Sequence, residues 1–447
     1  MYKPSKYNNK VIDNEELVIV NSLYGSRIKF TDIDNINIAN AILSGKIHKK
    51  QCENEVFQFL KENKMIVNEE IDENVYARLV KTDVVSNSRL QLIILPTEQC
   101  NFRCKYCYES FGRGKMAKET QDAIIKYISR NISRYSGLDI SWFGGEPLLA
   151  KDVIEYMSEK IDAICKKAKK MYTTTITTNA YCLDFETFRM LQKYNLVAVQ
   201  VTLDGIKETH DKQRVFANGE PTYDVIINNL IEIKNKAKSG VQKIILRTNV
   251  SKDIFDKMDE YIDFYSKTFG DDSRFSFFIR PVGDWGGEAV EQMKSKMMDS
   301  NSFRSVYNKI IKSDTKLNMN FFERFLVQGG CVCYAGKRNA YVIKSNGDIG
   351  KCTCELDSED NKIGKMLVSG DMDIDEFKLA KWIDISNYEK CSECSFYGFC
   401  VAMNCPLRGK ATDDEHVCPY EKEYFSETIK LMNSIGLIAP YESKVAI

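Results

Sequence analysis

Six short β-rich runs, each followed by an amphipathic stretch, constrain the fold of this chain more than any other feature of its sequence. The runs cover residues 90–97, 138–145, 173–180, 197–205, 243–250 and 274–282. Strands that are apolar almost throughout and alternate with helices are typical of parallel βα units, because such strands are covered on both faces. Six units in succession predict an α/β fold with a partial (β/α)6 TIM-like barrel, whose functional residues gather at the carboxyl ends of the strands.

Two further regions flank this barrel. Residues 15–31 are expected to form a β-hairpin and residues 32–47 and 50–67 two helices, which together predict a winged-helix-like module. The last part of the chain is rich in turns and cysteine and has few long periodic segments, apart from a helix expected at 421–436. The predicted organisation is therefore a module at 1–80, a connection at 80–89, a barrel at 90–316 and a cysteine-rich domain at 317–447.

The composition excludes several classes of protein. Lys and Arg together number 63, as do Asp and Glu, so the formal net charge is zero, whereas a dedicated nucleic-acid binder usually shows a basic excess. The first residues contain no apolar core of the signal-peptide type, and no run approaches the ~18 apolar residues of a membrane span. We therefore expect a cytoplasmic protein that binds neither nucleic acid nor membrane.

The 15 cysteines are unusual for such a chain, and most of them are clustered. The cytosol keeps thiols reduced, so clustered cysteines there bind metal more often than they form disulfides. Three cysteines lie within eight residues directly after the first predicted strand, and nine lie between Cys331 and Cys418. Cys52, Cys165 and Cys182 stand alone, and we interpret them as small buried apolar side chains.

The first group has the spacing Cys100-x3-Cys104-x2-Cys107. A structural zinc site needs four ligands and usually combines two pairs of cysteines. Three thiolates on a cubane iron–sulfur cluster leave one iron without a protein ligand. That iron can bind a small molecule through an amine and a carboxylate, so the spacing favours a cluster that holds a cofactor.

Several motifs, in this order, resemble the radical S-adenosylmethionine superfamily over about residues 92–282. Besides the three cysteines, they are "GGEP" after the second strand, "TTNA" at the third, "VTLDG" and "HDKQR" at the fourth and "LRTN" at the fifth. The resemblance implies that the three cysteines hold a [4Fe–4S] cluster and that S-adenosylmethionine bound to it yields a 5′-deoxyadenosyl radical. It places the S-adenosylmethionine contacts at Tyr106, Gly144, Gly145, Glu146, Pro147, Asn179, Thr202, Asp204 and Arg214.

Each of these motifs is weak when taken alone. "GGEP" or "LDG" by itself is typical of a tight turn, and a single histidine such as His210 is more often a satisfied structural residue than a ligand. In "TTNA", Ala180 stands where the family usually has glycine. The order of the motifs, with one at each strand end, is what favours a radical enzyme.

The second group of cysteines resembles the SPASM domain, which holds two auxiliary [4Fe–4S] clusters. Within it, "SNGDIGKC" (345–352) is typical of a hairpin turn that delivers a cysteine. A zinc ribbon on two of these cysteines would leave too many thiols unexplained. The resemblance places the distal cluster on Cys391, Cys394, Cys400 and Cys418 and the proximal cluster on Cys333, Cys352 and Cys405, with Cys331 or Cys354 open as a fourth ligand.

The N-terminal hairpin and helices resemble peptide-recognition elements of enzymes that modify ribosomally made peptides. Such elements bind a leader peptide as an added strand on an exposed sheet edge, and the candidate edges here are "LVIVNS" (17–22) and "SRIKFT" (26–31). The three regions together predict a maturase that forms a cysteine thioether in a precursor peptide, with flavodoxin or ferredoxin as external electron donor. Because a thioether cross-link removes two hydrogens, the auxiliary clusters would accept an electron or bind the substrate thiol.

Three other functions stay open. A radical enzyme that forms a C–C cross-link, or an anaerobic sulfatase-maturating enzyme, is the first, although the latter commonly has Asp where Thr353 follows Cys352. The second is a non-catalytic iron–sulfur electron carrier, which would need neither "GGEP" nor an open iron. The third is a winged-helix regulator with an iron–sulfur sensor, which would not need six βα units. The sequence identifies no general base, and Trp285 in "DWGGE" is explained equally well as channel lining or as packing.

Overall fold

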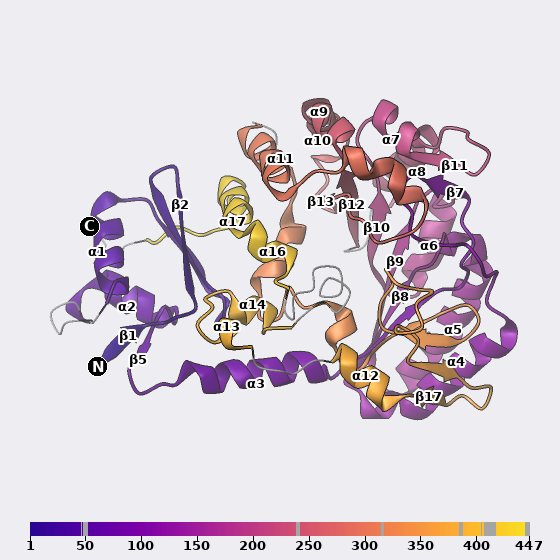
Figure 1. The fold of residues 1–447 in the computed structure, drawn as a ribbon, viewed down its shortest axis with the longest axis horizontal. Coiled ribbons are helices and arrows are strands. Elements are labelled where there is room, and N and C mark those ends of the chain that lie inside the picture. Colours follow the sequence, from indigo (N-terminus) through magenta and orange to yellow (C-terminus); the bar gives the residue numbers. More distant parts are fainter. Residues whose placement is uncertain are drawn as a thin grey trace. The chain divides into compact units, whose positions relative to one another are not determined.

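A computed structural model of the chain describes residues 1–45, 47, 52–237, 242–313, 317–383, 388–403, 405 and 417–442. The chain divides into two compact units (Figure 1). The first unit combines Met1–Ser86, Phe322–Gly336 and Asp384–Ile447, and the second combines Asn87–Phe321 and Lys337–Ile383. The two compact units therefore have other boundaries than the three predicted domains. The three domain ranges stay a prediction.

A ten-stranded sheet organises the described part of the second unit. Six of its strands are parallel and lie side by side in chain order, as expected of a partial barrel. They are β6 (Leu90–Ile94), β8 (Gly137–Trp142), β9 (Met171–Thr178), β10 (Leu196–Thr202), β12 (Lys243–Val250) and β13 (Phe275–Pro281). Each coincides with a predicted run, so the α/β fold and the six predicted strands are confirmed.

Helices connect these strands and cover the sheet. They are α4 (Lys118–Asn131), α5 (Lys151–Lys167), α6 (Phe185–Lys193), α7 (Lys207–Gln213), α8 (Tyr223–Lys236), α9 (Lys252–Asp256), α10 (Met258–Phe269) and α11 (Ser300–Lys312). On α5, the buried residues Val153, Met157, Ile161 and Cys165 share one face at helical spacing, which gives the helix its apolar side. Cys165 is thus a small buried side chain, as predicted, whereas Cys52 and Cys182 are only half-buried. In the described residues, no helix has the length and apolar character needed to cross a membrane.

Four more strands extend the same sheet beyond β6. β14 (Ala340–Ile343) pairs with β6 in parallel, and β15 (Asp348–Gly350), β16 (Gly364–Met366) and β17 (Met372–Ile374) follow in antiparallel order, before α12 (Glu376–Trp382). The turn from β14 to β15 contains Gly347 at φ +84°, a conformation that glycine adopts without strain. The hairpin predicted from "SNGDIGKC" is therefore present, and it belongs to the barrel sheet.

A three-stranded antiparallel sheet, β2–β3–β4, forms the centre of the first unit. β3 (Glu16–Asn21) and β4 (Arg27–Phe30) are the predicted hairpin, while β2 (Asn8–Asp13) reaches β3 through Asn14 and Glu15, both at positive φ. Because β3 lies between two strands, "LVIVNS" is not an edge, and that part of the prediction is wrong. The polar strand β2, "NNKVID", escaped recognition because it lacks an apolar run.

The remaining elements of the first unit are mainly helices. α1 (Ile33–Leu43) and α2 (Glu55–Glu62) match the predicted helices, and the helix predicted at 421–436 is present as α16 and α17, divided at Tyr424. The expected connection at 80–89 is helical as far as Ser86. The other elements are β1 (Tyr2–Pro4), β5 (Ile66–Asn68), α3 (Glu73–Ser86), α13 (Glu389–Ser392), α14 (Tyr397–Cys400), α16 (Tyr420–Glu423) and α17 (Phe425–Ser434).

Both faces of the central strand β3 are buried. On β3, Leu17 and Ile19 belong to a core shared with α1 and α2, whereas Val18 and Val20 belong to a second core. The second core contains Phe399 of α14 and Ile429 and Met432 of α17. Successive side chains of a strand point to opposite faces, so the continuous apolar run "LVIV" follows from burial on both sides.

We expect Ile429→Ala to destabilise β3 as well as α17, because Ile429 is fully buried in the core that both share. The loss should be about 2–5 kcal/mol, against about 0.5–1.5 kcal/mol for the control Ile429→Val. Hydrogen exchange should then speed up at the amides of β3 as well as within α17. A change confined to residues 420–442 would contradict the shared core.

Candidate functional site

A cavity of about 340 Å³ lies at the carboxyl ends of the parallel strands. Cys100, Cys104 and Cys107 line it together. The volume falls within the range usual for small-molecule sites. Six more of the predicted contact residues line the same cavity: Tyr106, Gly144, Gly145, Asn179, Thr202 and Arg214. The other three, Glu146, Pro147 and Asp204, are buried behind this lining.

Short-range backbone structure holds the three cysteines in one loop after β6. β7 (Phe102–Cys104) pairs with β11 (Arg214–Phe216), and this register sets Cys104 opposite Arg214. The N–H of Phe102 donates to Cys100 Sγ at 3.3 Å, and the N–H of Cys107 donates to the Cys104 carbonyl at 3.1 Å. The loop is therefore folded around its thiols.

Burial raises the pKa of all three thiols. Neighbouring Cys104 and Glu109 add to this effect at Cys107, whose pKa rises to about 12, while Arg214 opposes it. Thiols in such a place ionise when a cationic metal centre accepts them as ligands. In the described part of the chain, no three His, Cys, Asp or Glu side chains are grouped to hold one metal ion. Since the three cysteines line one cavity, they suit the three protein thiolates of a cluster with one open iron.

The "GGEP" loop packs its backbone directly on the cysteine loop. A Cβ on Gly144 would lie 2.2 Å from the Thr97 carbonyl oxygen, and one on Gly145 would lie 2.5 Å from the Gln99 carbonyl oxygen. Only glycine permits this approach. The Glu146 carboxylate is fully buried and accepts hydrogen bonds from the N–H of Asn179 at 2.7 Å and from Thr178 Oγ1 at 2.7 Å. Glu146 therefore joins the loop to the end of β9 instead of facing the cavity.

Tyr106 is the centre of a polar network beside the cysteines. Its hydroxyl donates to Asp204 and accepts from Arg214 Nη1 at 2.7 Å and from Asn249 Nδ2 at 3.1 Å. Asp204 also accepts from the N–H of Asn249 at 2.9 Å. Burial opposes a charged Arg214, but Cys104, Tyr106 and Asp204 outweigh it and raise its pKa. The network fixes an arginine cation beside the thiols.

His210 has a structural role in this region, as its isolated position in the sequence predicted. Burial lowers its pKa, with Arg214 adding to the effect, so the ring is neutral. Its Nδ1 accepts from the N–H of Asp204 at 3.2 Å, and its Nε2 lies 3.2 Å from Thr222 Oγ1, which itself donates to the Arg214 carbonyl. These contacts are consistent with a proton on Nε2, and they hold Asp204 and Arg214 in place.

Comparison with known proteins decides the family. The Radical SAM superfamily model matches residues 94–262, which contain the three cysteines and the strands β8, β9, β10 and β12. The chain therefore contains a radical SAM domain over these residues. It is 25% identical over 390 residues to a Cysteine-type anaerobic sulfatase-maturating enzyme of Clostridium novyi (strain NT), covering 79% of this chain and 98% of that enzyme. It is 31% identical over 180 residues to GTP 3′,8-cyclase of Clostridium botulinum (strain Hall), covering 38% of this chain and half of the cyclase.

Solved structures share the fold at lower sequence identity. The structure of anSMEcpe with bound AdoMet and Cp18Cys peptide has a TM-score of 0.58 at 16% identity and covers 78% of this chain and 99% of that chain. Streptococcus suis SuiB bound to the precursor peptide SuiA has a TM-score of 0.51 at 18% identity and covers 94% of this chain and 99% of that chain. The match to SuiB therefore covers a larger share of this chain than the match to anSMEcpe does.

Several residues of the cavity were not predicted as site residues. Arg247 and Asn249 belong to "LRTN", a motif to which the sequence assigned no contacts. Both line the cavity, and so does Trp285, for which channel lining was one of two expected roles. No sequence pattern pointed to Glu109, because its position in the cavity depends on how the loop after Cys107 folds. Its Oε2 is buried and has no hydrogen-bond partner among the described residues. Burial, with Glu98 nearby, raises the pKa of Glu109 to about 8.

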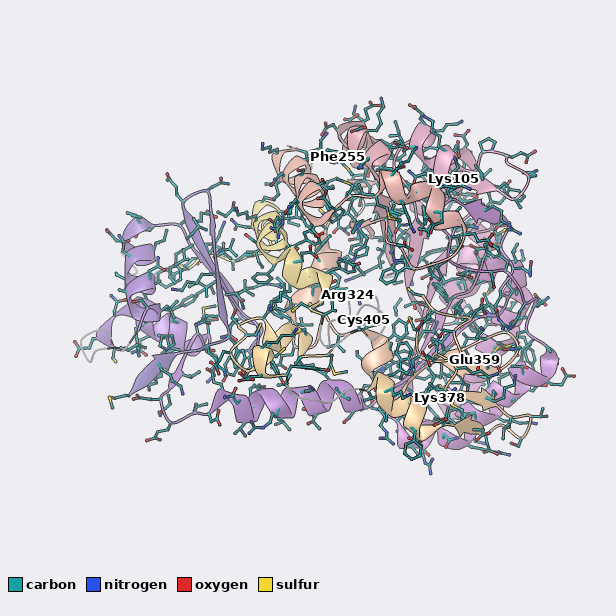
Figure 2. The ribbon with its side chains drawn as sticks, viewed as in Figure 1. Lys105, Phe255, Arg324, Glu359, Lys378 and Cys405 are labelled. Atoms are coloured by element: carbon teal, nitrogen blue, oxygen red, sulfur yellow. The ribbon has the colours of Figure 1, made fainter. Side chains whose placement is uncertain are left out.

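Cys354 lines the same cavity as the three cluster cysteines. Its N–H donates to Cys352 Sγ at 3.3 Å. A hydrogen bond with the Cys352 thiol and the nearby Arg247 cation lower the pKa of Cys354 to about 7, although burial opposes them. Cys352 and Cys354 belong to the second unit, whereas Cys331, Cys333 and Cys405 belong to the first. Cys405 is labelled in Figure 2. The proximal ligand set therefore stays a prediction.

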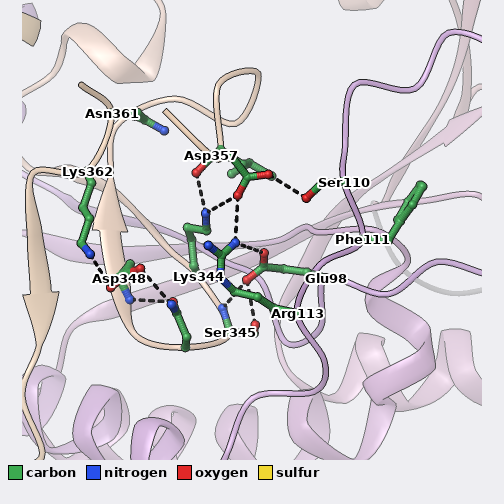
Figure 3. Close-up of polar contacts among 12 residues, drawn as sticks. Glu98, Ser110, Phe111, Arg113, Lys344, Ser345, Asp348, Asp357, Asn361 and Lys362 are labelled. Carbon is green, nitrogen blue, oxygen red and sulfur yellow. Dashed lines mark hydrogen bonds and ion pairs between the residues drawn. The ribbon is translucent and has the colours of Figure 1, made fainter. Parts of the chain in front are cut away.

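A polar network ties the cysteine loop to the β14–β15 hairpin (Figure 3). Glu98 accepts from Arg113 Nη1 at 3.0 Å and from Ser345 Oγ at 2.7 Å. Asp357 accepts from the same Arg113 nitrogen at 2.9 Å and from Lys344 Nζ at 3.1 Å. Arg113 thereby links a carboxylate that precedes the cysteine loop to one that follows Cys354.

The four cysteines predicted to hold the distal cluster are near one another in the first unit. Burial, together with the neighbouring Cys394, Cys391 and Cys418, raises the pKa of Cys400 to about 12. Lys422 Nζ lies 3.3 Å from Cys394 Sγ and 3.5 Å from Cys418 Sγ. Lys422 therefore lies beside two of the four predicted ligands, and the ligand set itself stays a prediction.

Gly145→Ala should disrupt the cysteine loop, because its Cβ would collide with the Gln99 carbonyl. We expect S-adenosylmethionine cleavage by the anaerobically reconstituted protein to fall roughly 10–100-fold, since misplacing reacting groups by about 1 Å has effects of this size. The control is Gly112→Ala, whose Cβ would meet Ser110 Oγ at an ordinary contact distance of 3.5 Å. Equal activity of the two variants would show that the close approach has no role.

Asp357→Asn should lower stability at pH 7, and the loss should shrink progressively as the pH falls below about 4. Hydrogen bonds from Arg113 and Ser110 hold the pKa of Asp357 well below its usual value. Its contribution is thus present above about pH 4, the pKa of an unfolded aspartate, and is lost as the pH falls. The melting temperature should drop by about 1–3 °C at pH 7, because the group is partly exposed. The control Asp371→Asn, at an exposed ion pair, should have a smaller effect, and an Asp357 effect independent of pH would contradict the ion-pair explanation.

Proposed function

We propose that this radical SAM enzyme installs a cysteine thioether cross-link in a ribosomally synthesised precursor peptide. The observation that carries the proposal is that one chain combines the three-cysteine cavity with the sheet β2–β3–β4. Among the described residues, the outer strand β4 of this sheet pairs on its far side only with the short segment 439–441, which an extended peptide could replace. The extent of the likeness supports it, because SuiB, described as bound to a precursor peptide, covers 94% of this chain, whereas anSMEcpe covers 78%.

The cavity offers a place for each part of the radical machinery. Cys100, Cys104 and Cys107 would hold a [4Fe–4S] cluster, and the lining residues Asn179, Thr202, Arg214 and the two glycines would bind S-adenosylmethionine. Together the two groups supply one-electron hydrogen abstraction once they are bound. The fixed cation of Arg214 suits the carboxylate of S-adenosylmethionine, since its own partners hold it charged and in position.

The other lining residues would bind the peptide and exclude water. Arg247 donates from Nε to Asn249 Oδ1 at 3.2 Å, and in the described residues it has no carboxylate partner. It therefore suits an anionic group, such as the substrate thiolate that forms the thioether. The buried Oε2 of Glu109 would accept a polar hydrogen of the peptide. Trp285 would cover the peptide from the segment after β13.

Thioether formation requires an electron acceptor, because the peptide loses two hydrogens in total. One leaves as a hydrogen atom, and the second leaves as a proton and an electron. We propose that two auxiliary [4Fe–4S] clusters accept the electron or bind the substrate thiol, with the four grouped cysteines around Lys422 as the distal site. An external flavodoxin or ferredoxin in the cytoplasm would supply the electrons that start the reaction.

A second candidate is oxidation of a protein cysteine, as the name of the Clostridium novyi relative suggests. The likeness over 98% of that enzyme favours it. The Asp common after the Gly-x4-Cys cysteine of such enzymes is absent here, because Thr353 follows Cys352 and lines the cavity. A C–C cross-link would use the same cavity and differ only in the atom that joins the carbon.

The experiment that tests the proposal uses anaerobically reconstituted protein, S-adenosylmethionine, a reductant and the Cys-containing peptide encoded beside the gene. Mass spectrometry before and after thiol alkylation would record the product. We expect each event to remove two hydrogens and one alkylatable thiol. The control is the protein with Cys100, Cys104 and Cys107 all changed to Ala, which should leave the peptide unchanged.

Three outcomes would contradict the proposal at different points. Loss of two hydrogens with all thiols still free would replace the thioether by a C–C or related link. Release of 5′-deoxyadenosine without any change in the peptide would mean a different substrate. If protein with full iron content released no 5′-deoxyadenosine, the assignment of the cavity residues would be wrong.

A further inference from the structure

The outer edge of β4 is already occupied by another segment of the first unit. The N–H of Lys29 donates to the Ala439 carbonyl at 3.1 Å, and the N–H of Tyr441 donates to the Lys29 carbonyl at 2.7 Å. Lys29 and Pro440 form a parallel bridge. Residues 439–441, here called the edge segment, thus take the position of a fourth strand beside β4, at the end of the trace that leaves α17 in Figure 1.

The edge segment also places an aromatic ring on the core. Tyr441 lies 5.1 Å from the ring of Phe30 and 4.8 Å from the ring of Phe59, in tilted and edge-to-face geometry. Phe30 is a fully buried residue of the core that β3 and β4 share with α1 and α2. Backbone pairing plus one side chain in a pocket is the general way in which an extended peptide binds a sheet edge.

The edge segment is held much less firmly than the helix before it. Asn433 of α17 donates to Asp13 at 2.9 Å and to Glu16 at 2.7 Å, and Ile438 is buried in the second core. Beyond Ile438, Ala439 and Pro440 are exposed, and backbone pairing is confined to Lys29. By contrast, β3 and β4 pair at four positions. The edge segment can therefore leave β4 without disturbing α17 or the sheet.

We propose that the edge segment is an internal competitor for a peptide-docking site on β4, and that the leader of the precursor peptide displaces it. This inference rests on the proposed function for the identity of the peptide. The incoming leader pairs with both backbone groups of Lys29 and sets an aromatic side chain against Phe30 and Phe59, in the place of Tyr441. The enzyme without precursor then keeps its edge strand covered.

Covering the edge has a physical purpose. An open strand edge pairs with other chains and promotes aggregation. Pro440 has no N–H, and its position opposite Lys29 turns its own backbone away from β4. An edge segment that never leaves β4 would protect the strand equally well. The experiment therefore has to distinguish a permanently paired edge segment from a displaceable one.

Hydrogen exchange on the full-length protein, measured with and without a synthetic leader peptide, distinguishes these two kinds of edge segment. If the leader displaces the edge segment, the Tyr441 amide loses protection, while the Lys29 amide stays protected because it gains a new acceptor. We expect the exchange of the Tyr441 amide to speed up at least tenfold. Leader binding that leaves Tyr441 protected would overturn the proposal, and so would failure of the leader to bind.

Variants test the same point by affinity. Tyr441→Ala should bind the leader about 3–10-fold more tightly than the unchanged protein, because it weakens the competitor alone, whereas Glu442→Ala at the exposed neighbouring residue should not. Lys29→Pro removes the outward N–H but no bond to β3, and it should weaken leader binding at least tenfold. Its matched control, Lys29→Ala, keeps the N–H and loses only the side chain that meets Glu16. Equal leader affinity in Lys29→Pro and Lys29→Ala would rule out docking on β4.

The cross-linking assay on the same variants distinguishes failure of this inference from failure of the proposed function. Cross-linked product without any change at the Tyr441 amide would keep the maturase and remove the competitor. Exchange at Tyr441 without any cross-linked product would keep the docking site and remove the proposed reaction.

Discussion

The parallel pairing of β14 with β6 is the constraint on which the site depends. Ala340–Ile343 lie beside Gln91–Ile94 in register, and the N–H of Leu95 continues the ladder to the Ile343 carbonyl at 2.9 Å. Both strands therefore end at the same edge of the sheet. The chain after β6 carries the first three cysteines, and the hairpin after β14 carries Cys352 and Cys354. Because the two segments share one sheet, Cys354 can line the cavity that the sequence assigned to the first three cysteines alone.

Local patterns predicted the parts of the structure that depend on neighbouring residues. The six parallel strands were recognised because strands buried on both faces must be apolar along their whole length. The glycines of "GGEP" were recognised as a turn, and the structure adds the reason, since Gly144 and Gly145 meet the carbonyls of Thr97 and Gln99. Ala180, in place of the usual glycine, adopts φ +62°, so the backbone keeps the glycine conformation despite the side chain.

Features that depend on distant contacts could not be predicted in the same way. β2 is polar, and it becomes a strand only because β3 supplies its hydrogen bonds. β14 is four residues long, too short for a period to show. Glu109 and Arg247 lie 138 positions apart and line one cavity only because the barrel brings their strand ends together. Glu109 and Arg247 are candidate site residues because they are buried and their polar groups lack some hydrogen-bond partners among the described residues. Neither property can be read from the spacing of residues in the sequence.

The two arginines of the cavity differ in how far neighbouring groups already satisfy their charges. Tyr106, held by Asp204, bonds Arg214, so the position of that cation is fixed before any ligand arrives. Among the described residues, Arg247 hydrogen-bonds the Asn249 amide oxygen and has no hydrogen-bonded carboxylate, and burial together with Arg280 lowers its pKa. A buried guanidinium that lacks a carboxylate gains more from an anionic ligand than one that already has partners. Arg247 is therefore the position where a bound anion most changes the energy of the site.

In the first unit, packing closes the centre of the sheet β2–β3–β4. Both faces of β3 are covered by apolar cores, so an added strand would have to pair at an edge. On β2, the Asn9 side chain donates to the Ser395 carbonyl at 2.9 Å and accepts from Ser395 Oγ at 2.7 Å, which fixes that side of the sheet to the segment before α14. On β4, the backbone of Lys29 meets only the edge segment. An extended peptide can thus gain backbone hydrogen bonds at β4 by exchange for a short segment, whereas at β2 it would have to break packing that belongs to the core.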